Sequence, residues 1–430
     1  MSRYASAGEA LKAVKNGDRV TVAHATGEPQ ALTAALWERK NELKDVEVVH
    51  MVCMGKGMYC TPEAGGHFKH NSLFIGGPAR RAFAEGRADF VPVHFSDIPA
   101  LFMEDVLPVD VALVQASRPD KRGHMSLGIS VDYTMATVKK AKAVIVQVNK
   151  YMPRTHGDSY IHVSDADYIV ECDEPLIELP RAELTEQDYA IGKNCASLVP
   201  DGACLQLGIG ALPDAVLFSL KEKNDLGIHS EMISDGVMEL VRAGVVNGSK
   251  KNLHKGKIVA TFVMGSREMY EFLDDHPIMY MAPADYVNDP FVIAQNNRMT
   301  SINSCVEVDL AGQVCAESVG LKQISATGGQ ADFVRGANHS RGGKSIIALP
   351  SVTKDLKTSK IVPFLANGAT VTTPRTDVRY IVTEYGVASM FGRNLRQRAR
   401  ALIGIAHPNF RDWLIEEYEK RFCEKFVSEV

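Results

Sequence analysis

Short apolar runs rich in β-branched residues alternate along this chain with longer stretches of helical character. The runs occupy residues 18–25, 45–52, 110–117, 142–149, 203–210, 257–265 and 380–386. Several are continuously apolar, without alternation of apolar and polar side chains, which is typical of strands buried on both faces. Helical patterns such as residues 29–43 lie between them. The alternation predicts an α/β fold with largely parallel sheets.

A faint internal repeat relates the two halves of the sequence. Residues 16–38 and residues 200–222 each run through a turn, a strand, a glycine-containing loop, a proline and a helix. Gly17 matches Gly202, and a helical segment precedes each unit. Chance similarity of two strand–helix units is the competing explanation. The repeat favours two similar open α/β domains.

The boundary between these domains is predicted within residues 173–188. Pro175 and Pro180 interrupt regular structure there. We therefore expect an N-terminal domain over residues 1–183 and a C-terminal domain over residues 184–430.

Composition and charge exclude several classes of protein. The chain has 430 residues, 45% hydrophobic and 23% charged, as expected for a soluble globular protein of two or three domains. Its formal net charge is −4 and it has no long basic block, so a nucleic-acid partner is disfavoured. No apolar run reaches about 18 residues, so no membrane span is predicted. The N-terminal segment lacks the apolar core of a signal peptide and indicates an amphipathic helix, so we expect a cytoplasmic protein.

Cysteine and histidine usage argues against a metal centre. The eight cysteines form no C-x-x-C pair and have mostly apolar neighbours, which favours buried reduced thiols over disulfides or zinc ligands. His24, His50, His67 and His70 match no compact ligand spacing, so packing roles are favoured over metal ligation. We expect no bound metal.

Two glycine-rich loops are candidate ligand contacts. Gly208 and Gly210 stand between a predicted strand and helix, where free N–H groups favour phosphate or an oxyanion. For this motif alone, an ordinary strand–helix turn is the simpler explanation. Pro213 occupies the place of the third glycine of a dinucleotide fingerprint, so a dehydrogenase is disfavoured. A second loop holds Gly328 and Gly329, and the Gly-Gly-Lys that follows it lacks the spacing of a nucleoside triphosphatase.

These segments together resemble the acetyl-CoA hydrolase/transferase family, in particular its 4-hydroxybutyrate and butyryl-CoA:acetate CoA-transferase branch. The resemblance covers essentially the whole chain and rests on the order and number of short motifs. They include FKHNSLFIGGPARRAF, SRPDKRGHMSLGIS, LQLGIGALPDAV, IHSEMISDG, NSCVEVDLAGQVCAES, GGQADFVRGA and TEYGVASMFGRN. Met390–Phe391 departs from the family, which more often has Leu-Arg-Gly-Lys in this region, and its effect on a substrate or CoA contact stays open.

The resemblance implies roles for individual residues. It places the catalytic glutamate at Glu231 and an oxyanion-stabilising amide at Asn303. CoA contacts are implied at Gly208, Ile209, Gly210, Ala211, Leu212, Val306 and Gly329. The pocket for the acyl group and acceptor acid is expected to involve His24, Glu28, Met54 and the loop at residues 117–130. Because the family motifs divide between the halves, the active site is expected at the domain interface, with Glu231 and the CoA loops on the C-terminal side.

The chemistry of a carboxylate nucleophile is consistent with these roles. A glutamate can attack an acyl-CoA to give a mixed anhydride, and the released thiolate can convert that anhydride into a glutamyl-CoA thioester. At its ordinary pKa of about 4.3 the carboxylate is ionised at neutral pH, so no general base is expected. CoA is then a substrate that is transiently covalent on Glu231, and no tightly bound cofactor is expected.

Several functions stay open at this level. The leading interpretation is transfer of CoA between a short-chain acyl-CoA and a short carboxylate. An acyl-CoA hydrolase would share the intermediate but needs a base for water, and His229 is the nearest candidate, although a packing or hydrogen-bonding role is favoured for it. A non-catalytic CoA-binding protein is a third possibility, which an intact Glu231 argues against. Sequence does not reveal the acyl group, and the family implies a homodimer or larger oligomer.

Overall fold

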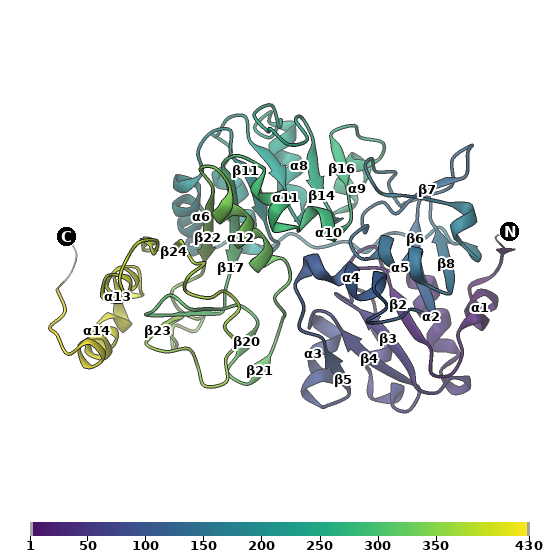
Figure 1. Ribbon diagram of the computed structural model, residues 1–430, viewed down its shortest axis with the longest axis horizontal. Helices are drawn as coiled ribbons and strands as arrows, with labels where there is room; N and C mark the ends of the chain where they lie inside the picture. Colours follow the sequence, from purple (N-terminus) through teal and green to yellow (C-terminus); the bar gives the residue numbers. More distant parts are fainter. Residues whose placement is uncertain (1–2, 428–430) are drawn as a thin grey trace.

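The computed structural model describes residues 3–427 and contains two eight-stranded sheets, one in each half of the chain (Figure 1). The first sheet is parallel throughout. Its strands, in spatial order, are β1 (Arg3–Tyr4), β10 (Tyr168–Glu171), β8 (Ala143–Val148), β6 (Val111–Ala116), β2 (Arg19–Val22), β3 (Val46–His50), β4 (Phe68–Ser72) and β5 (Ala88–Phe90).

The second sheet is parallel except at its last pair. In spatial order its strands are β16 (Met279–Met281), β14 (Ile258–Ala260), β12 (Gly227–His229), β11 (Cys204–Leu207), β17 (Met299–Ser304), β22 (Lys344–Ala348), β24 (Tyr380–Thr383) and β25 (Gly386–Ser389). Only the β24–β25 pair of this sheet is antiparallel. The predicted α/β class with largely parallel sheets is confirmed.

The two sheets share one order of connection, which confirms the internal repeat. In each half the first strand of the repeat, β2 or β11, lies in the middle of the sheet. The next three strands of the large sheet extend to one side of it, and the following strands extend to the other side. Residues 16–38 and 200–222 therefore occupy equivalent positions, each feeding a helix that crosses back over its sheet. The boundary between residues 183 and 184 stays a prediction.

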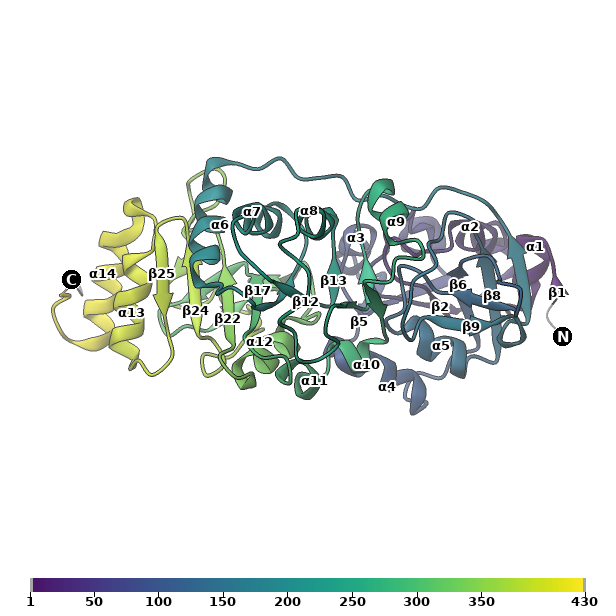
Figure 2. The same cartoon turned by 90° about the horizontal axis from the view of Figure 1, so that it is seen from above.

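Helices cover both sheets. Those of the first half are α1 (Ala7–Ala10), α2 (Gln30–Glu38), α3 (Gly77–Ala84), α4 (Ile98–Met103) and α5 (Thr134–Lys140). Those of the second half are α6 (Glu186–Leu198), α7 (Ala211–Ser219), α8 (Asp235–Arg242), α9 (Arg267–Leu273), α10 (Ala284–Val287), α11 (Pro290–Ala294), α12 (Gln330–His339), α13 (Leu395–Gly404) and α14 (Pro408–Phe422). In Figure 2 the predicted linker region runs along one side of the molecule to α6. Thr185 and Asp188 form a capping box that starts this helix.

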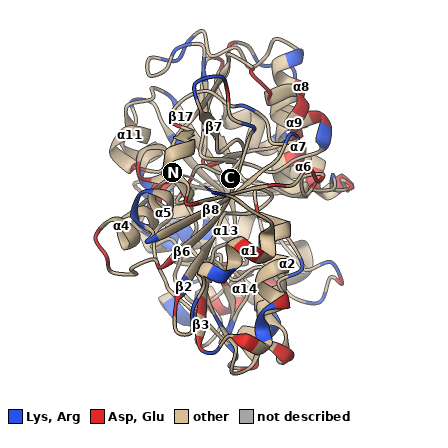
Figure 3. Cartoon of the chain, turned by 90° about the vertical axis from the view of Figure 1, so that its right-hand side faces the viewer, with Lys and Arg blue, Asp and Glu red and all other residues tan. Residues whose placement is uncertain are grey.

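Smaller sheets complete the fold. They pair β7 (His124–Ser126) with β9 (Tyr160–His162), β13 (Met232–Ile233) with β15 (Phe262–Val263), and β20 (Ser318–Val319) with β21 (Lys322–Gln323). A three-stranded sheet joins β18 (Glu307–Asp309), β19 (Val314–Cys315) and β23 (Ile361–Val362). Lys and Arg are interspersed with Asp and Glu on the face shown in Figure 3. Between residues 3 and 427, no helix has the length and apolar character needed to cross a membrane.

Two local predictions were wrong. The N-terminal segment is not one amphipathic helix, because residues 3–4 pair with β10 at the sheet edge before the short α1 begins. The run at residues 257–265 is not one strand either. It divides at Thr261 into β14 and β15, since β14 belongs to the large sheet whereas β15 pairs with β13. The interruption lies where the backbone N–H groups of Thr261 and Phe262 both donate to the carbonyl of Glu231, at 3.0 and 3.2 Å.

A buried apolar cluster joins the halves at this point. The first half contributes Phe95 and Tyr133, and the second half contributes Met232 and Phe262. Ser130 also forms a backbone bridge with Phe262. The interface between the halves is thus a packed core, and the break between β12 and β13 lies beside it.

Candidate active site

Glu231 lies between β12 and β13, just past the carboxyl end of a central strand of the second sheet. Open α/β sheets bind their ligands at this edge. The backbone at residues 130–132 of the first half reaches the same place, because Val131 N donates to Thr261 O at 3.1 Å. The apolar cluster beside Glu231 leaves its side chain only partly exposed. Glu231 is therefore positioned by both halves.

The Glu231 carboxylate is held by two donors from the second half. Asn288 Nδ2 donates to Glu231 Oε2 at 2.8 Å, and the backbone N–H of Gly329 also hydrogen-bonds the carboxylate. A Cβ atom at Gly329 would lie 1.9 Å from that same oxygen. Only glycine allows the backbone to come this close.

Burial raises the pKa of Glu231 to about 8. The Asn288 and Gly329 hydrogen bonds oppose this rise, while the negative charges of Asp332 and Asp132 add to it. The expectation of a carboxylate ionised at neutral pH was therefore wrong for the ligand-free protein. Its basis was the pKa of a solvated glutamate, which does not include the cost of desolvating the charge.

Asn303 lies near the carboxyl end of β17, a central strand of the second sheet. Its amide pairs reciprocally with that of Gln206 on the neighbouring strand, with both N–O distances 3.1 Å. The structure thus brings Asn288, and not Asn303, to the Glu231 carboxylate. The segment Asn288-Asp289-Pro290 is a turn signal in the sequence, but nothing in it connects Asn288 with a residue so distant along the chain.

The predicted CoA loop at Gly208–Gly210 joins β11 to α7. Gly210 adopts a φ of +105°, which only glycine tolerates without strain. Ile209 is exposed and, with Arg181, Lys221 and Asp235 among others, lines a cavity of about 280 Å³. Ala211 and Leu212 form the first turn of α7, with Leu212 buried. Ile209 and Gly210 therefore line an open cavity beside the N-terminus of α7.

The other predicted contacts of the second half have partners other than the Glu231 carboxylate. Val306 follows β17, and its backbone N–H donates to Cys315 O at 2.8 Å. Met390 is buried in the core of the second half, whereas Phe391 is exposed and stacks on Arg379, whose guanidinium carbon is 4.6 Å from the ring centroid. Their relation to a CoA molecule stays a prediction.

The pocket residues predicted in the first half fall into two groups. His24 is buried at the interface between the two halves, called the seam below. Its Nδ1 is 3.3 Å from Asp132 Oδ2, and the centre of its ring is 4.5 Å from that of Phe262. Glu28 instead accepts a hydrogen bond from Gly55 N at 2.8 Å, next to the partly buried Met54. Glu28 also lines a separate cavity of about 490 Å³ beside α2. His24 is thus at the interface near β15, whereas the Glu28 carboxyl faces the 53–55 turn.

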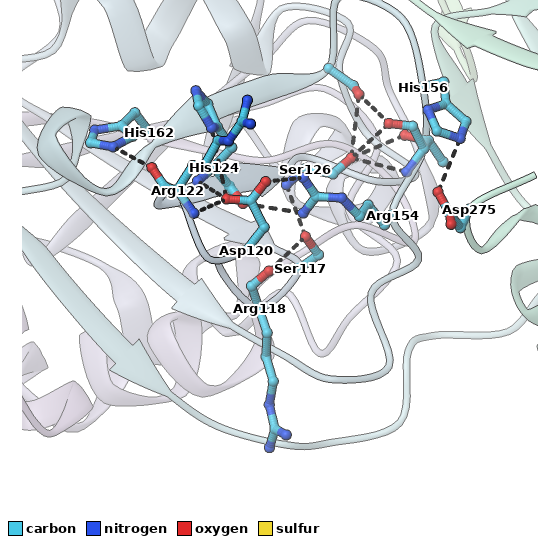
Figure 4. A network of polar contacts seen from close by, with 12 residues as sticks. Ser117, Arg118, Asp120, Arg122, His124, Ser126, Arg154, His156, His162 and Asp275 are labelled. Carbon is cyan, nitrogen blue, oxygen red and sulfur yellow. Dashed lines mark hydrogen bonds and ion pairs between the residues drawn. The ribbon is translucent and has the colours of Figure 1, made fainter. Parts of the chain in front are cut away.

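The loop at residues 117–130 divides in the same way. Its first part leads into β7, which pairs antiparallel with β9, and Asp120 there accepts from Arg154 Nη2 at 2.9 Å and from backbone N–H groups (Figure 4). Its far end reaches the seam, where Ser130 Oγ accepts from His24 N at 3.0 Å. Only this far end lies at the interface beside Phe262.

His229, the candidate base for a hydrolase, is fully buried. Its Nε2 donates to Val287 O at 2.8 Å. Burial lowers its pKa to about 3. A ring held in this way is neutral at physiological pH and packs against α10, so it is poorly placed to take a proton from water.

Among the described residues, one cluster of three side chains has the spacing to hold a metal ion. A potential ligand atom from each of Glu28, His50 and Cys53 lies within 4.8 Å of the others. These groups already have partners, because Tyr59 Oη lies 2.5 Å from His50 Nδ1 and Gly55 N donates to Glu28. The group is therefore a buried cluster whose members hydrogen-bond their neighbours, although His50 Nε2 has no hydrogen-bond partner among the described residues.

Comparisons with known proteins relate both halves to one family. The acetyl-CoA hydrolase/transferase N-terminal domain matches residues 1–179, and the C-terminal domain of that family matches residues 265–418. The chain is 58% identical to the 4-hydroxybutyrate coenzyme A transferase of Clostridium kluyveri, over 98% of each chain. It is 40% identical to the butyryl-CoA:acetate CoA-transferase of Anaerostipes caccae, over 96% of this chain and 95% of that one. The crystal structure of 4-hydroxybutyrate CoA-transferase from Porphyromonas gingivalis superposes with a TM-score of 0.85 at 42% identity, over 98% of each chain.

Proposed function

Because the chain belongs to the acetyl-CoA hydrolase/transferase family and is a CoA-transferase, we propose that it moves CoA from a short-chain acyl-CoA to a short carboxylate. The donor is of the 4-hydroxybutyryl or butyryl type, and the acceptor is an acid such as acetate, as in the names of these relatives. Glu231 with its two donors, Asn288 and Gly329, is the observation that carries the proposal.

The proposed reaction proceeds through two thioester exchanges at Glu231. The carboxylate attacks the acyl carbon, the C–S bond breaks, and CoA leaves as a thiolate from an acyl-glutamyl anhydride. The thiolate attacks Cδ of Glu231 and expels the first carboxylate, leaving a glutamyl-CoA thioester. The acceptor acid then reverses both steps: its oxygen attacks Cδ and releases the thiolate, which attacks the acceptor's acyl carbon. A new acyl-CoA leaves and the Glu231 carboxylate is regenerated.

The geometry supports this sequence at the atom that develops charge. Each attack on Cδ turns a Glu231 oxygen into an oxyanion, and Asn288 Nδ2 and Gly329 N already donate to that carboxylate. Donors placed before the reaction stabilise the transition state without reorganisation. We assign the side-chain oxyanion donor to Asn288. The raised pKa of Glu231 also places a proton on the resting carboxyl, which must leave before attack.

Transfer is favoured over hydrolysis by the surroundings of Glu231. The apolar cluster that contains Met232 and Phe262 restricts water beside the thioester. His229, the base that a hydrolase would require, donates its ring N–H to a carbonyl and has a lowered pKa. We further propose that the protein is cytoplasmic and forms a homo-oligomer. Size-exclusion chromatography with light scattering tests the oligomeric state directly.

Incubation with butyryl-CoA alone is expected to leave a CoA adduct on Glu231, detected by intact-mass analysis and by borohydride reduction at that residue. CoA transfer should then require an added acid, and acetate should yield acetyl-CoA in an amount equal to the butyryl-CoA consumed. Release of free CoA without acceptor, at the rate of the best acceptor reaction, would establish the hydrolase instead. Absence of any adduct together with absence of CoA transfer to an acid would support a non-catalytic CoA-binding protein.

Asn288→Ala is expected to lower kcat/KM by about 100-fold, because one oxyanion donor is worth roughly 3 kcal/mol in the barrier. Asn303→Ala is the matched control, since the Asn303 amide is engaged by Gln206. We expect it to lose less than about tenfold, the cost of one ordinary hydrogen bond. Steady-state rates for both variants check the assignment, and a larger loss at Asn303 would reverse it.

A further inference from the structure

Asp332 links the two halves of the protein beside Glu231. It lies in the first turn of α12 and is 3% exposed. Its carboxylate accepts from Ser96 N at 3.2 Å and from Ser96 Oγ at 3.1 Å. Ser96 belongs to a 3₁₀ turn of the first half, whose Phe95 N also donates to Gly328 O at 3.2 Å. In Figure 1 the neighbouring helices α4 and α10 meet at this seam.

Asp332 also bonds the amide that touches Glu231. The Asn288 side chain hydrogen-bonds Asp332 as well as Glu231. In its ionised, attacking form Glu231 only accepts hydrogen bonds, and so does ionised Asp332, so both then require the NH₂ group of the amide. Asn288 Oδ1 accordingly points away and has no hydrogen-bond partner among the described residues. Asp332 therefore selects the amide orientation that presents a donor to Glu231.

A buried carboxylate at this position is costly to the fold. Burial raises the pKa of Asp332 to about 6. The nearest basic group is His94, whose Nδ1 is 3.9 Å from Asp332 Oδ1. An asparagine of the same shape would fill the space without this cost, so packing alone does not account for the charge.

We propose that Asp332 is a positioning residue. It accepts hydrogen bonds from Ser96 of the first half and, through Asn288, keeps an amide donor directed at Glu231. The packing of the first half against α12 is thereby coupled to the orientation of the Asn288 donor at the oxyanion site. The inference rests on the proposed function, because it assigns Asp332 a role in forming the Glu231 thioester.

Asp332→Asn is expected to lower kcat by about 10- to 100-fold, since its own amide competes for orientation with that of Asn288. The KM for butyryl-CoA should stay within about twofold, and the thermal midpoint at pH 8 should not fall. Asp309→Asn is the matched control: Asp309 is also buried and accepts from Ala311 N and Gln313 N, both at 2.9 Å, in the turn after β18. That variant should lose stability and keep kcat.

The pH profile separates positioning from a structural role. In the wild type, Glu231 binds a proton below about pH 8 and Asp332 binds one below about pH 6, so log(kcat/KM) should fall with a slope of about 1 between these values and about 2 below pH 6. His94 faces Asp332, and Asp132 acts on Glu231, so both belong to the same electrostatic group. In Asp332→Asn the slope should be about 1, and the Glu231 limb should move to lower pH because a neighbouring negative charge is gone.

A double-mutant cycle with Ser96→Ala tests the link between the halves. That variant alone should lose about threefold in kcat, whereas adding it to Asp332→Asn should cost little more. Wild-type kcat and an unchanged pH slope in Asp332→Asn, with the CoA adduct still formed by the wild-type enzyme, would overturn the positioning role alone. A wild-type enzyme that forms no adduct would overturn the proposed function and this inference together.

Discussion

Replacement of Glu231 by glutamine is expected to lower CoA transfer by at least about 10⁴-fold, as for other covalent nucleophiles. Glutamine preserves the shape of the side chain but cannot attack an acyl-CoA or form the thioester. Intact-mass analysis should show no CoA adduct. Transfer rates within tenfold of the wild type would rule out Glu231 as the nucleophile.

The same substitution should stabilise the protein at neutral and alkaline pH. The pKa of Glu231 rises from 4.5 to about 8 on folding, so the folded state favours the protonated form. The contribution of Glu231 to stability is complete below pH 4.5 and is lost as the pH rises through 8. Glutamine does not titrate and avoids this loss.

Glu231→Gln should therefore exceed the wild type in free energy of unfolding by about 2 kcal/mol at pH 8, a value reduced for the partial solvent access of the side chain. The difference should shrink toward zero as the pH falls to 4.5. Denaturant unfolding at several pH values measures it. A difference that does not vary with pH would show that burial does not perturb this carboxyl.

Gly329→Ala is expected to reduce kcat by about 10³-fold while leaving the fold intact. The added Cβ would stand 1.9 Å from Glu231 Oε2 and 2.3 Å from Asn288 Nδ2, so the carboxylate and its amide donor must separate. Loss of such preorganised donors costs roughly 4 kcal/mol in the barrier. The φ of Gly329 is −91°, which alanine adopts without strain. The loss would thus arise in the site and not from the backbone.

Gly404→Ala provides the control for this substitution. Gly404 lies in α13, where an added Cβ meets no described atom within 4 Å. Alanine there should stabilise the helix by about 0.5–1 kcal/mol and leave kcat unchanged. Circular dichroism and steady-state kinetics on both variants separate the two effects. Near-normal turnover in Gly329→Ala would show that the loop moves away from Glu231 during catalysis.

Much of the architecture could be predicted from local patterns. The continuous apolar runs at residues 110–117 and 142–149 became β6 and β8, central strands of a parallel sheet. The weak repeat between residues 16–38 and 200–222 corresponds to equivalent positions in two sheets of the same connection order. These features are encoded in stretches of about ten to twenty residues, so periodicity alone detects them.

Predictions that depended on distant contacts were less successful. The run at residues 257–265 has one composition throughout, but it divides because two of its N–H groups bond the backbone of Glu231. Asn303 and Asn288 each follow a β-branched apolar residue and precede a polar one, and no local pattern distinguishes them. The division of the 117–130 loop between the exposed turn before β7 and the interface of the two halves was also not detectable in the sequence.

The sequence by itself determined the α/β class and the two related halves, and through its family resemblance it predicts Glu231 as the residue at the centre of the chemistry. The tertiary structure alone decided which groups face that carboxylate and what its pKa is. Asn288 is 57 residues from Glu231 along the chain, and Gly329 and Asp332 are still more distant. Their approach depends on how the strands of one sheet align and on how the other half packs against it. Burial and the field of neighbouring charges exist only after that packing, so the protonation of Glu231 is a property of the folded protein.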